Sequence, residues 1–238
     1  MVADKAGYFE SFARHFVPVH REGHKFLGIG ALVTLVAFLL STSLGVVAAI
    51  GTLYVAYFFR DPDRVTQLRD GLVIAAADGD VAEIEKVLPP SELDLNGGER
   101  VRIVTHLSPF DVHVNRAPVA GRVSQSVYVP GAFVNPTTNK ESDDNERRLT
   151  VLTTPDETQC IVVQIAGMIS RRIVAFVHEG DSVGAGQRIG LIRFGSRVDV
   201  YLPPGATPLV SVGQRVVAGE SVLADLKSKE PEREARRS

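Results

Sequence analysis

The most prominent pattern in the chain is an uncharged, mostly apolar run from Phe26 to Phe59. As one straight helix this run would be about 50 Å long, whereas the hydrocarbon core of a bilayer is about 30 Å thick. Two arrangements therefore fit, a single over-long or tilted helix and a helical hairpin that breaks between Ser41 and Gly45. We expect the hairpin, with arms of about 15 residues that are short for a full crossing of the bilayer.

Basic residues flank the run, with Lys25 before it and Arg60 after it. Because Lys and Arg favour the cytoplasmic face of a membrane, both ends of the hairpin are expected on that side. Tyr54, Tyr57 and the pair Phe58–Phe59 are predicted to form an aromatic belt at the interface. A cleaved signal peptide fits less well, since the run starts late, is too long and lacks a clear cleavage site.

The pattern changes after Asp61 to short runs rich in Val and Ile, separated by Gly, Pro and Asp turns. Examples are RVRIVTHLSP, GRVSQSVYVPG, RLTVLTT and QCIVVQIAG. This spacing predicts a sandwich or barrel of short strands. No stretch after residue 64 has the long 3.6-residue apolar period of a helix. The fold class is therefore mainly β, with an N-terminal hydrophobic helical hairpin.

An internal repeat supports this prediction. EGDSVGAGQRIGLI is followed at one constant spacing by VGQRVVAGESVLADL, and the matching pairs are Gly180 with Gly213, Val183 with Val216, Ala185 with Ala218, Gly186 with Gly219 and Ile189 with Val222. The glycines suit positive-φ turns, and the valines suit one inward face. Such a duplication is typical of a barrel-sandwich core of the biotinyl/lipoyl type. Carrier domains of that type present a lysine for modification, whereas this chain has Phe194–Arg197 in the interval.

The predicted organisation is an N-terminal segment at 1–25, a membrane-associated hairpin at 26–59, a β-rich domain at 60–226 and a charged tail at 227–238. The apolar fraction of 45% in 238 residues is that of a globular chain, and the net charge of −2 argues against a nucleic-acid partner. The single cysteine, Cys160, lies in a strand-like apolar run and is expected to be a buried, inert thiol.

The dipeptide Gly195–Ser196 stands between two strand-like runs in IRFGSRVDVYLP. Glycine has no Cβ, so the serine oxygen can approach the glycine carbonyl carbon, and an unusual backbone geometry is accessible. An N-to-O acyl shift would turn this peptide bond into an ester. β-Elimination would then cut the chain and leave a dehydroalanine, which hydrolyses to a pyruvoyl group. The residues allow this chemistry but do not by themselves require it.

IRFGSRVDVYLP resembles the self-processing site of the phosphatidylserine decarboxylases, specifically the short type of bacteria and archaea. Further motifs of that family follow one another in the expected order: FFRDPDR, AAADGDV, HLSPFDVHVNRAPVAGRV, YVPGAFVNP, NER and QIAGMISRRIV. The resemblance covers most of the chain from Phe58 to Leu202. Several motifs in the right order are far more specific than any one of them.

The resemblance implies autocatalytic cleavage between Gly195 and Ser196 into a β chain (1–195) and an α chain (196–238), with Ser196 becoming an N-terminal pyruvoyl cofactor. Phosphatidylserine would be decarboxylated to phosphatidylethanolamine through a Schiff base to that group. The two chains would stay together as a heterodimer, and whether heterodimers pair further is left open. The expected location is the cytoplasmic face of the cell membrane, with the enzyme peripheral or anchored by the hairpin.

Two further residues match motif positions of the family. Asp78 in AAADGDV and His113 in SPFDVHVNR are expected to act with Ser196, the histidine as base and proton donor and the aspartate as its orienting charge. Longer family members carry a second histidine where this chain has Arg116, so a role assigned to that histidine does not transfer. Arg116 is instead expected to bind the substrate carboxylate or phosphate.

Several nearby residues have more than one interpretation. Asp78–Gly79 is also an ordinary type I′ turn pair. Asp111 is expected to support its loop or His113, and His106 to lie at a strand end. Arg147 and Arg148 are either head-group contacts or plain surface charges, and Arg147 is retained as a substrate-binding candidate.

Two other functions compete with the decarboxylase. A zinc peptidase of the lysostaphin type has a similar sandwich, but zinc needs converging ligands. Here His106, Asp111 and His113 come without an H-x-H pair, so no metal site is predicted. A membrane-tethered adaptor without enzymatic activity would need no special chemistry at Ser196.

Overall fold

The computed structural model describes residues 17–93, 95, 98–131, 145–167, 172–193 and 196–228, with Ser196 described by its backbone. Of the predicted cleavage dipeptide, Gly195 lies outside the described residues. The chain divides into two compact units, Met1–Asp63 and Arg64–Ser238, which are described here one at a time.

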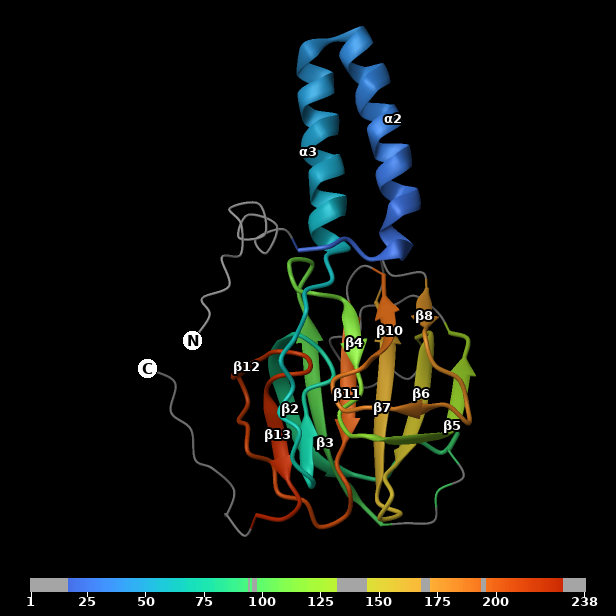
Figure 1. Cartoon of the computed structure of the whole chain (residues 1–238), viewed down its shortest axis with the longest axis vertical. Coiled ribbons are helices and arrows are strands. Elements are labelled where there is room, and N and C mark those ends of the chain that lie inside the picture. The colour runs from blue at the N-terminus through green and yellow to red at the C-terminus, as the bar shows by residue number, and fades with distance from the viewer. Residues whose placement is uncertain are drawn as a thin grey trace, which may run out of the picture. The chain divides into compact units, whose positions relative to one another are not determined.

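The first unit is a pair of antiparallel helices, seen in blue in Figure 1. A short 3-10 turn, η1 (Arg21–Gly23), leads into α2 (His24–Leu40), and α3 (Thr42–Phe58) follows. The chain reverses at Ser41, whose backbone is extended with φ −165° and ψ 139°. The predicted helical hairpin is therefore confirmed, and the break falls at the first residue of the predicted interval.

Small side chains allow the two helices to pack closely. A Cβ on Gly45 would lie 2.2 Å from the ring of Phe38, so only glycine admits that ring. The Oγ1 atoms of Thr34 and Thr52 are 3.0 Å apart and share a hydrogen bond between the helices. Most large apolar side chains of the hairpin are nevertheless exposed, as at Leu39 with 80% exposure. Among described residues, the stretch Arg21–Leu40 is long and apolar enough to span a membrane, and Thr42–Phe58 is shorter.

The base of the hairpin is closed by its own flanking residues. Val19 and Arg60 form an isolated antiparallel bridge, and the His20 N–H donates to the Phe59 carbonyl at 2.8 Å. Phe58 and Phe59 are fully buried, and the Phe59 ring stacks on Phe26 at 5.3 Å. The prediction that Phe58–Phe59 belongs to an interfacial aromatic belt was therefore wrong, because the pair forms the small core that joins the ends of the two helices.

The second unit consists of antiparallel strands, and its described residues contain no helix (Figure 1). The largest sheet has eight strands in the order β12-β2-β3-β11-β7-β6-β5-β9, and two smaller sheets have the orders β4-β10-β8 and β1-β13. The strands are β1 (Leu72–Ile74), β2 (Gly79–Val87), β3 (Arg100–Leu107), β4 (Val114–Arg116), β5 (Gly121–Val129), β6 (Arg147–Thr153), β7 (Gln159–Ala166), β8 (Ile173–Ala175), β9 (Ser182–Val183), β10 (Arg188–Ile192), β11 (Ser196–Tyr201), β12 (Arg215–Val216) and β13 (Val222–Asp225). The mainly β fold class is confirmed.

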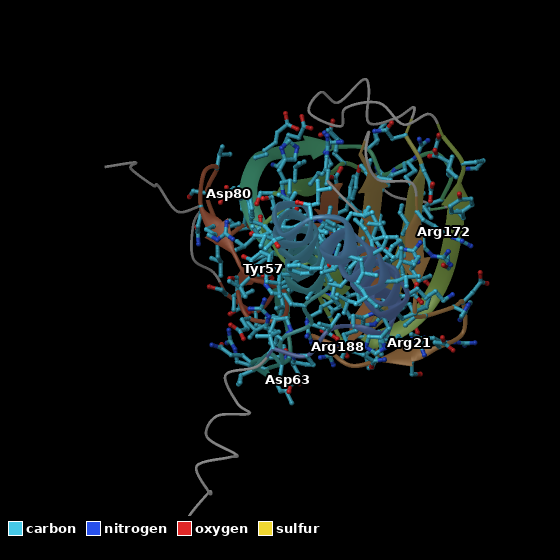
Figure 2. All side chains as sticks on the ribbon, turned by 90° about the horizontal axis from the view of Figure 1, so that it is seen from above. Arg21, Tyr57, Asp63, Asp80, Arg172 and Arg188 are labelled. Atoms are coloured by element: carbon cyan, nitrogen blue, oxygen red, sulfur yellow. The ribbon has the colours of Figure 1, made fainter. Side chains whose placement is uncertain are left out.

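The strand order sets the two sides of this unit. Asp80, at the start of β2, and Arg172, just before β8, lie on opposite sides of it in the view of Figure 2. Between them run the central strands β3, β11 and β7 of the large sheet. Residues at the ends of these three strands are therefore enclosed by neighbours on both sides.

The internal repeat corresponds to two similar halves of this unit. In one half β1 pairs with β13 and β2 with β12, and in the other half β4 pairs with β10 and β5 with β9. The repeat glycines have matching positive φ angles, +95° at Gly180 and +85° at Gly213, +75° at Gly186 and +79° at Gly219. The duplicated strand–turn–strand units thus close the two ends of the curled sheet in the same way.

The core lies on the inner face of the large sheet and is built mainly from Val, Ile, Leu and Ala. Cys160 belongs to it, is fully buried, and burial raises the pKa of its thiol to about 12. A thiol with that pKa is protonated at neutral pH and unreactive, as predicted. A second apolar cluster on the outer face includes Leu149, Val163 and Tyr201.

The close approach at Gly121 provides a test of the register of β5. A Cβ on Gly121 would lie 2.4 Å from the Thr153 carbonyl oxygen, a backbone atom that cannot move aside alone. We expect Gly121→Ala to lower the unfolding free energy by about 2 kcal/mol through overpacking. The control is Gly98→Ala, where a new Cβ meets nothing within 4 Å. Equal thermal unfolding midpoints for the two variants would contradict this register.

Candidate active site

The predicted cleavage position lies at the start of a central strand. Ser196 is the first residue of β11 and is opposite Leu107 of β3 on one side and Ala166 of β7 on the other. Because both pairings are antiparallel, β3 and β7 end where β11 begins, as Figure 1 shows. Ser196 therefore lies at one defined end of the large sheet.

His113 is brought to the same end of the core through the small sheet. Its carbonyl accepts a hydrogen bond from Ile192 N–H at 3.1 Å, and Ile192 is the last residue of β10 before the cleavage segment. Two residues further along, Asn115 Oδ1 accepts a bond from Gln164 Nε2 at 2.8 Å, which ties β4 to β7. His113 is two residues before Asn115, and Ala166 is two residues after Gln164. His113 and Ala166, which is opposite Ser196, are therefore equally far along the chain from this hydrogen bond.

The environment of the His113 ring fixes which nitrogen carries the proton when the ring is neutral. The side chain is fully buried, and Nδ1 lies 3.0 Å from the Asp111 carbonyl oxygen. A carbonyl can only accept a hydrogen bond, so Nδ1 carries the proton and Nε2 is the basic atom of the neutral ring. A buried histidine of this form is suited to take a proton from a hydroxyl group.

Asp78 reaches this end of the sheet from β2. Asp80 is opposite His106 on β3, and the next residue of β3 is the one opposite Ser196. The start of β2 and the start of β11 therefore flank β3 at the same end, about 10 Å apart across two strand spacings. The interpretation of Asp78–Gly79 as a type I′ turn was wrong, because that turn needs a positive φ at both central residues and, of these two, only Gly79 has one.

Both carboxylate oxygens of Asp78 have partners. Oδ2 accepts from Arg64 Nη2 at 2.7 Å, and Oδ1 accepts from the Ala218 N–H at 2.8 Å. Burial raises the pKa of Asp78 above its ordinary value, and the Ala218 N–H and the Arg64 charge act in the opposite direction. Ala218 belongs to the predicted α chain, so this aspartate joins the two predicted chains.

Asp111 supports the loop between β3 and β4, as one interpretation expected. Its carboxylate accepts from the Ser108 N–H at 2.8 Å and pairs with Arg215. Burial raises the pKa of Asp111, but the Ser108 hydrogen bond and the Arg215 bond outweigh it, so the pKa lies below its ordinary value. Asp111 thus remains a carboxylate near neutral pH and holds the backbone that carries His113.

The arginines expected to bind substrate occupy different places. Arg116 is buried on β4, and its Nη1 donates to the Gly186 carbonyl at 2.9 Å. Arg147, at the start of β6, pairs with Glu92. Arg148 donates to Ser126 Oγ at 2.9 Å across the β5–β6 pair. Arg116 and Arg147 are not brought together, and substrate binding by either stays a prediction.

Arg147 lines a groove of about 400 Å³ on the outer face of the sheet. Side chains alternate along a strand, so Arg197 of β11, which also lines this groove, is on the opposite face from the position of Ser196. Arg197 is 2% exposed and makes paired bonds of 2.6 and 2.8 Å to Asp199. Burial would lower the pKa of Arg197, but the Asp199 bonds outweigh it and the pKa is raised.

His106 lies within β3, opposite Asp80 and Arg197. Burial lowers the pKa of His106, and the Arg197 charge lowers it further, so the ring is neutral at physiological pH. Residues directly opposite each other in paired strands belong to the same face, so His106 belongs with Arg197 to the outer face. Ser196 belongs to the other face. A direct role for His106 therefore gains no support from its position.

Sequence reasoning missed two residues that organise the site. The Glu146 carbonyl accepts from Ala166 N–H at 2.9 Å, and its carboxylate accepts from Ile173 N–H at 3.1 Å. Glu146 therefore holds the segments that precede and follow residues 168–171, next to the neighbour of Ser196. Arg64 is the other, as the partner of Asp78. Their motifs, NER and FFRDPDR, belong to the family resemblance, but a buried partner cannot be identified from a motif alone.

The described part of the chain contains no group of three or more His, Cys, Asp or Glu side chains that could hold a metal ion. His106 in particular is within β3 of the large sheet, whereas His113 precedes β4 of the small sheet. The residues at the end of the sheet are instead a histidine, an aspartate and the serine that starts β11. This set suits proton transfer and acyl chemistry.

Comparison with known proteins agrees with the motif order. Residues 52–224 match the family model described as phosphatidylserine decarboxylase. A phosphatidylserine decarboxylase proenzyme of Xanthobacter autotrophicus is 50% identical over 227 residues, which cover 95% of this chain and 97% of that protein. A protein of the same name from Azorhizobium caulinodans is 51% identical over 215 residues, covering 90% of this chain and 92% of its own length. The chain therefore belongs to the phosphatidylserine decarboxylase family.

Proposed function

We propose that this protein decarboxylates phosphatidylserine to phosphatidylethanolamine after cutting its own chain between Gly195 and Ser196. Family membership supports the decarboxylation. The observation that carries the self-cleavage is the position of Ser196, at the first residue of a strand that is paired on both sides. A rigid strand start next to glycine is a place where one peptide bond can be held in a reactive geometry.

The cleavage uses only groups of the chain itself. The Ser196 hydroxyl loses its proton to a base and attacks the Gly195 carbonyl carbon, and the peptide nitrogen leaves to give an ester. Removal of the Ser196 α-proton then expels the Gly195 carboxylate. The resulting dehydroalanine tautomerises and hydrolyses, releasing ammonia and leaving the N-terminal pyruvoyl group. His113, buried at the same end of the core, is the proposed base.

Asp78 is proposed to orient and charge-stabilise the proton-transfer step. Its support is a buried carboxylate at the end of the sheet where β11 begins, held from both sides by Arg64 and by the Ala218 N–H. In turnover, the ketone of a pyruvoyl group supplies an electron sink for the loss of CO₂ from an amino acid. His113 then returns a proton to the substrate carbon.

The two products of the cut are expected to remain one folded unit. The predicted α chain contributes β11, which lies between β3 and β7, and also β12 and β13, which pair with β2 and β1. The Arg215–Asp111 ion pair and the Ala218–Asp78 hydrogen bond also cross the predicted chain boundary. Losing one peptide bond leaves these contacts intact, so the α and β chains stay associated as a heterodimer.

Arg116 is the better supported of the two substrate-contact candidates. Its backbone N–H donates to the Ala76 carbonyl at 2.9 Å, two residues from Asp78, whereas Arg147 lines the groove on the outer face of the sheet. A guanidinium can bind a carboxylate or phosphate through two parallel hydrogen bonds. The bond from Arg116 Nη1 to the Gly186 carbonyl would hold the guanidinium plane in one orientation for such a contact.

The hairpin suits a lipid substrate. Its apolar side chains are largely exposed, as at Leu53 with 69% exposure, and water is a poor environment for so continuous an apolar surface. Helices of 17 residues are about 25 Å long, slightly less than the hydrocarbon thickness. We propose that the hairpin anchors the enzyme in the membrane, with both ends on the cytoplasmic side.

Replacement of the serine tests the cleavage. Ser196→Ala lacks the hydroxyl that forms the ester, so the full chain should remain uncut and should release no CO₂ from phosphatidylserine. Intact-mass measurement of the purified protein provides the test, and Ser182→Ala, on the exposed β9 position, serves as the control that is cut normally. A Ser196→Ala protein that still yields residues 196–238 as a fragment excludes this mechanism.

The histidine has a matched control in the same domain. His113→Gln should slow self-cleavage about a hundredfold or more, since a positioned acid–base group contributes roughly that much. His178→Gln removes a histidine whose side chain is 77% exposed and should change nothing. The measurement is the fraction of cut chain against time by denaturing gel. Equal cleavage rates for the two variants would remove His113 from the mechanism.

The anchor can be tested by deleting residues 26–59. If the hairpin holds the enzyme at its substrate, activity on phosphatidylserine bilayers should fall much further than activity on a short-chain, water-soluble phosphatidylserine. Both activities are measured as CO₂ release and compared with those of the full chain. Equal losses on the two substrates would indicate that the hairpin has another role.

A further inference from the structure

Residues 64–66, which we call the strap, run across the two turns of the internal repeat. A Cβ on Gly186 would lie 1.9 Å from Thr66 Oγ1, and one on Gly219 would lie 3.4 Å from Arg64 Cβ and 3.5 Å from Thr66 Oγ1. The Val65 N–H also donates to Glu220 at 3.3 Å. The two glycine turns therefore form the surface on which the strap is seated.

The strap directs one charged side chain inward. Arg64 Nη2 is 2.7 Å from Asp78 Oδ2, and the two side chains are only 14% and 10% exposed. The other oxygen of this carboxylate is held by the Ala218 N–H, on the turn just before Gly219. The Asp78 carboxylate thus lies between the strap and one of the turns that the strap covers.

The charges around Asp78 act in opposite directions. Burial raises the pKa of the carboxyl, as does the negative charge of Asp111, whereas the Ala218 N–H and Arg64 lower it. Arg215 also interacts electrostatically with Asp78, but its main partner is Asp111. Arg64 is the cation that bonds directly to Asp78, so it is the group best placed to keep this buried carboxyl ionised.

We propose that Arg64 is a positioning residue for self-cleavage, which holds the Asp78 carboxylate ionised and oriented at the end of the sheet where the chain is cut. This inference rests on the proposed role of Asp78. Arg64 itself touches neither the cut bond nor the substrate, and it acts through the aspartate. The strap thereby makes the stretch of chain just after the hairpin part of the processing machinery.

The test compares Arg64→Gln, Arg64→Lys, Arg69→Gln and Asp78→Asn. Arg69 is the matched control, since it lies five residues after Arg64 and also pairs with an aspartate, Asp225. The Arg69 side chain is 60% exposed. Each full-length chain is made by cell-free synthesis and transferred into buffers from acidic to alkaline pH. The rate of cleavage at Gly195–Ser196 is followed by intact mass, and the thermal unfolding midpoint is recorded for each variant.

Without Arg64 the pKa of Asp78 should rise, so the acid limb of the pH–rate profile should move to higher pH. At a pH on that limb, Arg64→Gln should cleave about tenfold more slowly for each unit of displacement, while the alkaline rates approach those of the wild type. Arg64→Lys keeps the charge but has one ammonium group in place of the planar guanidinium. Its pH–rate profile should therefore lie between those of the wild type and Arg64→Gln. Arg69→Gln should follow the wild type.

The outcomes separate this inference from the function it rests on. A profile of Arg64→Gln that overlies the wild type, or one lowered equally at all pH values, overturns the positioning role and leaves a structural ion pair. If Arg64→Gln does not fold, a wild-type profile for Arg64→Lys with a lowered unfolding midpoint also overturns it. Normal cleavage by Asp78→Asn removes Asp78 from the mechanism and the inference with it. An uncut wild-type chain refutes the proposed function itself.

Discussion

The pairing of β11 on both of its edges is the constraint on which the rest of the structure depends. A strand that starts at Ser196 and is hydrogen-bonded to β3 and to β7 has no freedom to shift its register. That register brings the ends of β3 and β7 to the same place, and with them the loop of His113 and the segment held by Glu146. The same register assigns alternate residues of β11 to opposite faces of the sheet. Val198 and Val200 pack in the core, whereas Arg197 lines the groove on the outer face.

The duplicated halves explain how such a strand start can carry reactive groups within a stable core. Each half closes one end of the sheet with a glycine turn and a short paired strand. Buried polar groups bridge the layers, as in the Gln164–Asn115 bond. Burial makes unpaired polar groups costly, so these fixed partners limit the positions that the nearby histidine can adopt.

Much of the fold was predictable because it depends on local patterns. The helical hairpin, the short strands, the repeat and the buried Cys160 all follow from apolar spacing and turn residues. The errors came where a local pattern has two uses. Phe58–Phe59 looked like an interfacial pair but packs against Phe26, and Asp78–Gly79 looked like a type I′ turn but leads into β2 of the large sheet. Contacts between distant residues decided both cases.

By itself the sequence determined the family, the uncharged hairpin, the β-rich domain and the three residues proposed for the chemistry, because motif order and apolar periodicity are properties of the linear chain. Only the tertiary structure decided that Asp78 has Arg64 and Ala218 as partners, that Glu146 holds two segments and that Arg147 lies on the outer face. The physical reason is strand pairing, since hydrogen bonds between residues far apart in the chain set which side chains share a face and which charges are buried together.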